Sequence, residues 1–110
     1  VTATAVTTGT GGTCEGLLAA MEAANEKARF CSNFKPVIQC NGSVILLDTC
    51  GCPTIIANEN NVGDYQAAQQ AYNDWVSAGC GPYPCEVCNP VMGGGICSGP
   101  GDAGLCTPHD

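Results

Sequence analysis

Ten cysteines in a chain of 110 residues constrain the fold more than any other feature of this sequence. A dense, even set of cysteines in a short chain is typical of a disulfide framework formed in an oxidising compartment. A domain of this size buries only about two-thirds of its unfolded surface, so cross-links add stability that burial alone does not supply. We therefore expect five disulfides, no free thiol and a secreted, extracellular or cell-surface protein. The cysteines are Cys14, Cys31, Cys40, Cys50, Cys52, Cys80, Cys85, Cys88, Cys97 and Cys106.

Metal binding is the alternative use of so many cysteines. Cys50 and Cys52 form a C-x-C motif, and Cys85 and Cys88 form a C-x-x-C motif. Zinc sites usually pair two such motifs or add histidines, but the only histidine is His109, next to the last residue. We expect no metal and no cofactor. The pairing stays open, because ten cysteines allow on the order of a thousand connectivities.

The charge balance excludes several classes of partner. Ten acidic residues against three basic ones give a formal net charge of -7. Nucleic acids and anionic membranes bind Lys and Arg clusters, which this chain lacks. It also lacks an apolar stretch long enough to span a bilayer and a basic-then-apolar leader. We expect no nucleic-acid partner, no membrane insertion, and a mature secreted product whose targeting segment has been removed.

Residues 1–13, VTATAVTTGTGGT, carry no charge. Threonine and valine favour extended backbone, and every second residue of a strand lies on the same face. One interpretation is a flexible or O-glycosylated tail. The other, which we favour, is a strand that pairs with a sheet edge in its own subunit or in a neighbour. The candidate residues of that interface are Val1, Ala3, Ala5 and Val6.

Two segments have the apolar periodicity of helices. The first runs from Cys14 to residue 30 or 31, with Thr13 as its N-cap. The second runs from Tyr65 to Ala78, with a cap at position 61 or 64, and Gly79 ends it. Its aromatic row suggests sugar stacking, but at helical spacing we interpret it as core. The apolar stripe of this helix, which includes the aromatic row, consists of Tyr65, Ala68, Tyr72, Trp75 and Val76.

Residues 37–47, VIQCNGSVILL, suggest a β-hairpin. Asn41-Gly42 supplies the positive φ angles of a type I′ turn, which pairs Gln39 with Val44. Asn41 also begins an Asn-Gly-Ser glycan acceptor, so glycosylation is an alternative role for it. The motif CGCP follows at 50–53, and we expect its two cysteines to tie the hairpin to two different parts of the chain.

From residue 80 onward the chain is rich in Cys, Gly and Pro, which predicts a stapled loop region. A small hairpin there would bring Ile96-Cys97 near Leu105-Cys106. Five cysteines precede this region and five lie in it, so at least one disulfide must join the two parts if all are paired. The predicted fold is a small disulfide-rich α+β domain over 14–110, with two helices packed on a β-hairpin or small antiparallel sheet.

The order of these features resembles a loosely defined group of small cysteine-rich secreted proteins and lipoproteins of myxobacterial genomes. The matching features are the cysteine-bounded helix, VIQC, CGCP, the helix end WVSAGC at 75–80, and the clustered C-terminal cysteines. The resemblance covers about residues 14–106 and leaves out 1–13. It implies an exported disulfide-rich fold and no particular site residues.

No residue pattern indicates catalysis. General acid–base or nucleophilic chemistry needs a positioned His, carboxylate, Ser or Cys, and no such constellation is visible, so we expect no enzyme. The first functional hypothesis is an extracellular structural protein that self-associates, as an oligomer or filament, by N-terminal strand exchange. The alternative is a secreted binding module, such as a protease inhibitor. It would use the Cys80–Cys88 loop, with Tyr83 between Pro82 and Pro84 as the anchor.

Overall fold

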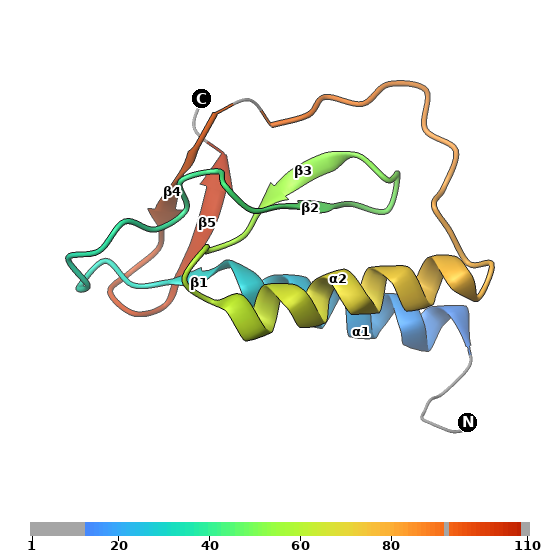
Figure 1. Ribbon diagram of the computed structural model, residues 1–110, viewed down its shortest axis with the longest axis horizontal. Coiled ribbons are helices and arrows are strands. Elements are labelled where there is room, and N and C mark those ends of the chain that lie inside the picture. The colour runs from blue at the N-terminus through green and yellow to red at the C-terminus, as the bar shows by residue number, and fades with distance from the viewer. Residues whose placement is uncertain (1–12, 92, 109–110) are drawn as a thin grey trace.

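The computed structural model describes residues 13–91 and 93–108, which form two helices and five strands (Figure 1). The predicted disulfide-rich α+β fold is confirmed. The helices are α1, Cys14–Arg29, and α2, Val62–Ser77. The strands are β1, Phe30–Cys31; β2, Ile45–Leu47; β3, Pro53–Ile56; β4, Gly95–Ser98; and β5, Gly104–Pro108.

Local signals in the sequence mark the start of α1 and the end of α2. Thr13 caps α1 as predicted, because its hydroxyl accepts a hydrogen bond of 3.0 Å from the Gly16 N–H. α2 starts three residues earlier than predicted, after Asn61. The Asn61 side chain makes no cap bond and instead donates to the Phe30 carbonyl at 2.8 Å, at the end of α1. Gly79, at φ 81°, takes the left-handed conformation that ends α2.

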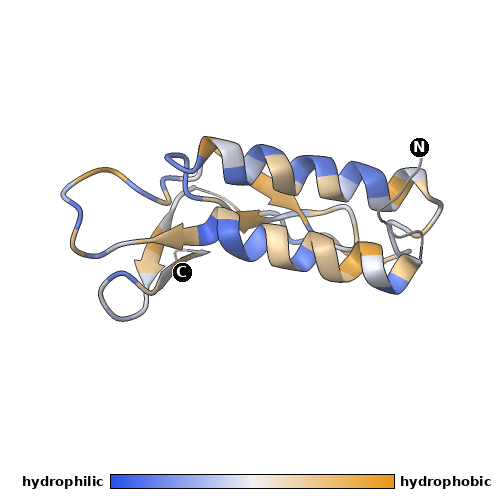
Figure 2. Ribbon diagram, turned by 90° about the horizontal axis from the view of Figure 1, so that it is seen from below, coloured by the Kyte–Doolittle hydropathy of each residue, from blue (hydrophilic) through white to orange (hydrophobic). Residues whose placement is uncertain are grey.

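The two helices pack side by side, and the strands lie across one side of the pair (Figures 1 and 2). One buried cluster joins the helices to β2 and β3 through Ala28, Ala68 and Leu46. Trp75 of α2 is completely buried. The aromatic row therefore belongs largely to the core, as the sequence indicated.

The strands form two separate antiparallel sheets. One has the order β1-β5-β4, and its β4–β5 hairpin pairs Cys97 directly with Cys106. The sequence predicted this proximity. The other sheet consists of β2 and β3, and pairs Ile45 with Ile56.

The predicted hairpin around Asn41-Gly42 is wrong. Residues 37–40 form no strand, and the side chains of Val37 and Ile38 are 55% and 74% exposed. The Asn41 side chain instead accepts a hydrogen bond of 2.9 Å from the Ser43 N–H, a local Asx turn. The Cys40 carbonyl accepts from the Gly95 N–H at 2.7 Å. Contacts with distant residues thus fix this segment, and β2 takes β3 as its partner.

All ten cysteines are paired, and every disulfide joins a cysteine before residue 80 to one at or after it. The two parts therefore fold as one unit. Cys50 and Cys52 bond to Cys85 and Cys88, so both reach the same short segment. The expectation that they tie the hairpin to two different parts of the chain is therefore wrong. The pairs are Cys14–Cys80, Cys31–Cys97, Cys40–Cys106, Cys50–Cys85 and Cys52–Cys88.

Candidate functional site

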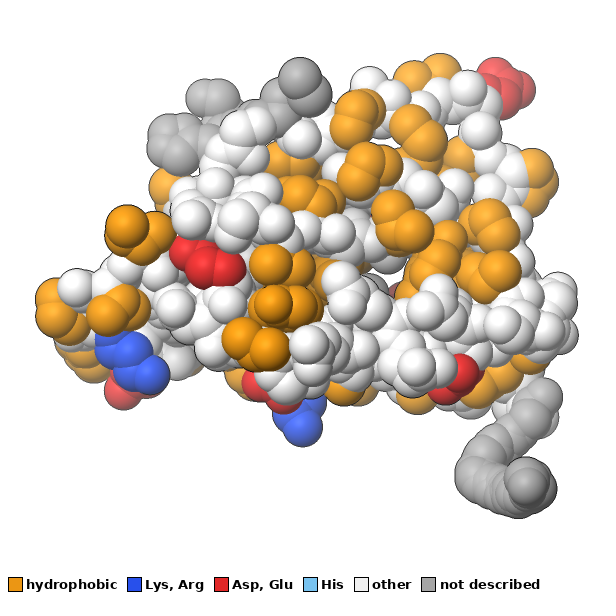
Figure 3. All heavy atoms as spheres, in the orientation of Figure 1, with side chains coloured by type: hydrophobic (Ala, Val, Ile, Leu, Met, Phe, Trp, Pro, Cys, Tyr) orange, Lys and Arg blue, Asp and Glu red, His pale blue; other side chains and the backbone are white. Residues whose placement is uncertain are grey.

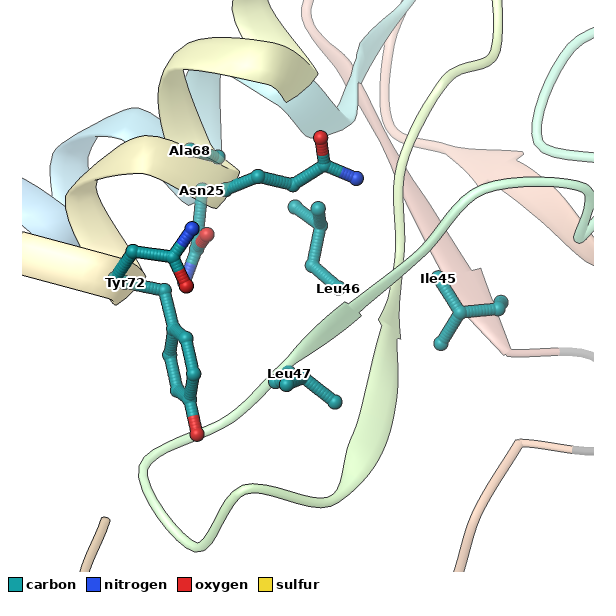
Figure 4. A pocket seen from close by; sticks show the side chains of 8 residues that line it. Asn25, Ile45, Leu46, Leu47, Ala68 and Tyr72 are labelled. Carbon is teal, nitrogen blue, oxygen red and sulfur yellow. The ribbon is translucent and has the colours of Figure 1, made fainter. Parts of the chain in front are cut away.

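A groove of about 360 Å³ lies between the helix pair and β2 (Figure 4). Its apolar walls come from β2 and from one small residue of α2. Its polar side chains come from the helices. The apolar residues are Ile45, Leu46, Leu47 and Ala68. The polar residues are Asn25, Gln69, Tyr72 and Asn73.

One wall of the groove is a strand edge without a strand partner. β2 pairs only with β3 in the described part of the chain. The Ala57 N–H donates to the Val44 carbonyl at 3.0 Å, and backbone groups alternate in direction along an antiparallel strand. The N–H and C=O of Ile45 therefore point away from β3, toward the open edge. On the far side of the sheet, the Pro53 carbonyl of β3 already accepts the Val91 N–H at 3.0 Å.

Asn25 is the deepest polar group of the groove. It projects from α1 and is only 9% exposed. Gln69 and Asn73 lie one turn apart on α2, at the rim. In Figure 4, Leu46 points from β2 toward the helices.

Among the described residues, none that lines the groove has a charged side chain. Backbone N–H and C=O groups on one side and carboxamides on the other offer both donors and acceptors. Such a surface matches a neutral peptide backbone better than an ion. On the face drawn in Figure 3, hydrophobic side chains gather over the strands and the segment after α2, and charged side chains are few.

The Cys80–Cys88 loop is held more firmly than its sequence suggested. Tyr83 packs edge-on against Trp75, with ring centroids 5.3 Å apart, and its N–H donates to the Thr49 carbonyl at 2.8 Å. The predicted anchor, Tyr83, is thus partly engaged with the core, while Pro82 and Pro84 are exposed. The most exposed apolar side chain of this loop is Val87, at 69%.

Val87 was not singled out from the sequence, although a signal was present. It lies between Cys85 and Cys88, whose disulfides both return to the CGCP turn. Val87 is therefore an exposed apolar side chain on a loop that two disulfides hold in place.

Asp48 organises the turn to which those disulfides attach. One carboxylate oxygen accepts the N–H groups of Cys50 and Cys52, both at 2.9 Å, and the other accepts the Thr54 hydroxyl at 2.6 Å. Burial disfavours the charged carboxylate, but the hydrogen bonds from Thr54, Cys52 and Cys50 outweigh this effect. The pKa of Asp48 therefore lies below its ordinary value of 3.8.

The remaining predicted residues lie apart from the groove. Asn41 is exposed, and its backbone N–H donates to Glu59 at 3.2 Å. Val1, Ala3, Ala5 and Val6 lie outside the described residues.

The sulfur atoms of Cys31, Cys40 and Cys106 lie within 4.8 Å of one another, a spacing that metal ligands also have. Each of these sulfurs is bonded in a disulfide. Metal ligation needs thiolates, so this cluster offers no ligand set while the bridges are intact.

Comparisons with protein-family models, with curated proteins and with solved structures found no match. Within the described ranges, no helix is both long and apolar enough to cross a membrane.

Proposed function

We propose that this protein is a non-enzymatic extracellular structural subunit that assembles with copies of itself by strand exchange. The observation that carries the proposal is one edge of β2, which has no strand partner among the residues that the structure describes and lies beside a neutral groove. An exposed strand edge presents free backbone groups and is a template for a further strand.

An extracellular setting is supported by the five disulfides, which are typical of oxidising compartments. Each disulfide of a small domain contributes roughly 2–4 kcal/mol to stability. Such cross-linking suits a protein that persists outside the cell. The resemblance to exported cysteine-rich proteins points the same way.

The donor strand in this proposal is residues 1–8, VTATAVTT, which carry no charge and favour extended backbone. In strand addition, backbone hydrogen bonds supply affinity and alternate side chains supply fit. A segment of one molecule that binds a different surface of the next makes a head-to-tail contact, which propagates into a ring or a filament.

The test is the mass and shape of the purified protein, measured by light scattering and negative-stain electron microscopy. The full chain is compared with a variant lacking residues 1–12 and with one in which they are replaced by a Gly-Ser segment of equal length. We expect oligomers or filaments from the full chain only. Monomers from all three proteins would reject the proposal, and equal assembly of all three would reject the role of the N-terminus.

A second candidate function is supported by the exposure of Val87. A loop held by disulfides at Cys85 and Cys88 loses little entropy on binding, which is how rigid inhibitors gain affinity. A secreted protease that prefers small apolar side chains is the matching partner class. Inhibition of an elastase-like protease by the wild type, but not by Val87→Asp, would support this function, whereas cleavage without inhibition would reject it.

Glycosylation of Asn41 also stays a prediction. Its side-chain oxygen is used in the turn to Ser43, and the residue is exposed. A mass decrease after enzymatic glycan removal, absent in Asn41→Gln, would support the modification. An unmodified mass of the protein from its native source would reject it.

A further inference from the structure

We infer that Asn41 is a site of spontaneous covalent modification, at which the backbone nitrogen of Gly42 attacks the side-chain carboxamide. A bond forms between the Gly42 nitrogen and Cγ of Asn41. The bond from Cγ to the side-chain nitrogen breaks, and that nitrogen leaves as ammonia with the amide proton of Gly42. Water then opens the succinimide ring at either carbonyl, which leaves aspartate or isoaspartate at position 41. This reactivity does not depend on the proposed strand exchange, and water is its only co-reactant.

Gly42 makes Asn41 the most reactive asparagine of the chain. Ring closure requires the next backbone nitrogen to approach the carboxamide, and a side chain on the next residue hinders that approach. Glycine has no side chain and leaves the backbone free to adopt the geometry of the ring. Asn41 is the only asparagine in the sequence that is followed by glycine.

The fold requires glycine at position 42, so a protecting side chain cannot be accommodated there. Gly42 has a φ of 86°, in the left-handed region that favours glycine. A Cβ on Gly42 would lie 2.5 Å from the Gly93 carbonyl oxygen. The backbones are as close in the reverse direction, because a Cβ on Gly94 would lie 2.9 Å from the Asn41 carbonyl oxygen. The close contact between these two segments therefore preserves the reactive Asn-Gly pair.

The Asn41 carboxamide is also placed for the reaction. Its oxygen accepts a hydrogen bond of 2.9 Å from the Ser43 N–H. This Asx turn folds the carboxamide back over the peptide group of Gly42, which holds the attacking nitrogen. The hydrogen bond also draws electron density toward the oxygen, so Cγ becomes a better target for attack. Asn41 is exposed, so water reaches the ring.

The product would place a new carboxylate close to Glu59. The Asn41 backbone N–H donates to Oε1 of Glu59 at 3.2 Å, and Oε2 of Glu59 is buried without a hydrogen-bond partner among the described residues. A second negative charge there repels the first. Isoaspartate also lengthens the backbone next to Cys40, whose carbonyl accepts the Gly95 N–H at 2.7 Å. We therefore expect the modification to loosen residues 40–43 and to lower the stability of the protein.

The experiment uses the full, oxidised chain from a host that does not glycosylate asparagine, because enzymatic removal of a glycan itself converts asparagine to aspartate. The protein is incubated at neutral and at mildly alkaline pH, and peptide mapping follows each asparagine. Conversion raises the mass of a peptide by about 1 Da. Asn33 and Asn73 are internal controls, because both are exposed and are followed by residues with side chains. Asn41→Gln is the matched variant, since its longer side chain must close a larger ring.

We expect position 41 to convert roughly tenfold faster than Asn33 and Asn73, because only glycine leaves the attacking nitrogen unhindered. Conversion should be faster at alkaline pH, where the attacking nitrogen loses its proton more readily, and absent at position 41 of Asn41→Gln. Conversion of Asn41 no faster than that of the two controls would overturn the inference.

The effect on stability is measured on the converted protein, which ion exchange separates by its added negative charge. It should unfold at a lower urea concentration than the unconverted protein. Asn41→Asp carries the charge without the longer backbone and should lie between the two. Equal urea midpoints for the converted and unconverted proteins would overturn the predicted loosening of residues 40–43.

Discussion

Cys97 and Cys106 lie directly opposite each other on β4 and β5, yet each is bonded to a cysteine outside this hairpin. Cys97 bonds to Cys31 at the end of α1, and Cys106 bonds to Cys40 in the loop before β2. Two adjacent positions of one hairpin thus fasten it to two separate segments. The C-terminal hairpin is held to the domain by these two disulfides, by pairing with β1 and by the packing of Cys106 against Ile56.

Three disulfides close equal chain separations of 66 residues, which allows a controlled comparison. In the chain-entropy description, removal of any one of them costs roughly 4 kcal/mol. Cys40 and Cys106 are buried, whereas Cys14 is exposed. We therefore expect the Cys40→Ala/Cys106→Ala variant to lose more stability than Cys14→Ala/Cys80→Ala in urea unfolding. Equal losses would mean that packing around the sulfurs contributes little.

Gly81 lies against the indole ring of Trp75, and a Cβ at this position would overlap that ring. Because Trp75 is completely buried, the ring has no space to move into. Gly81→Ala should lower the free energy of unfolding by roughly 1–3 kcal/mol, as overpacking does. Chemical unfolding followed by the fluorescence of the single tryptophan measures this change.

The matched control for Gly81→Ala is Gly63→Ala in α2. A Cβ at Gly63 meets no atom within 4 Å, so alanine there should raise stability by about 0.5 kcal/mol through helix propensity. The same sign of effect at both glycines would argue against a steric role for Gly81.

Asp48 should make the CGCP turn sensitive to acid. Its folded-state pKa lies below the ordinary value of 3.8, so the ionised form stabilises the fold at neutral pH. That contribution is lost as the pH falls below 3.8 and through the lower folded pKa. Asp48→Ala should cost roughly 2 kcal/mol at pH ~7, from its hydrogen bonds to a charged group, and less at pH ~2.

Urea unfolding at both pH values measures the effect of Asp48→Ala. Asp74→Ala, which removes one exposed hydrogen bond to Gln70, is the control and should change stability by less than about 0.5 kcal/mol. A loss for Asp48→Ala that is the same at both pH values would contradict a role for the ionised carboxylate.

Asn58 joins the end of α1 to the start of α2. Its side chain donates to the Phe30 carbonyl at 2.9 Å, its backbone N–H donates to the Ala28 carbonyl at 2.8 Å, and the residue is 3% exposed. Asn58→Ala should destabilise the protein by roughly 2 kcal/mol, because buried polar groups lose a partner. The melting temperature, compared with that of the exposed control Gln66→Ala, provides the check. A similar small shift in both would show that Asn61 alone suffices at the Phe30 carbonyl.

Structural features that depend on residues close together in the chain could be predicted from the sequence. The N-cap at Thr13, the helix end at Gly79 and the two helical stripes depend on spacings of three or four residues. The hairpin that pairs Cys97 with Cys106 was also indicated by residues close in the chain. The Asn41-Gly42 hairpin signal was equally local and failed, because Cys40 is held by Cys106 and Gly95.

The sequence by itself therefore determined the helices, the number of disulfides and the α+β class, since short-range geometry and the oxidation of cysteines specify them. Only the tertiary structure decided which cysteines pair, that β2 joins β3, and that Asn25 lies in a groove at an open strand edge. Those features depend on contacts between residues far apart in the chain. The free energy that stabilises these features comes from burial and cross-linking, which no local pattern of residues predicts.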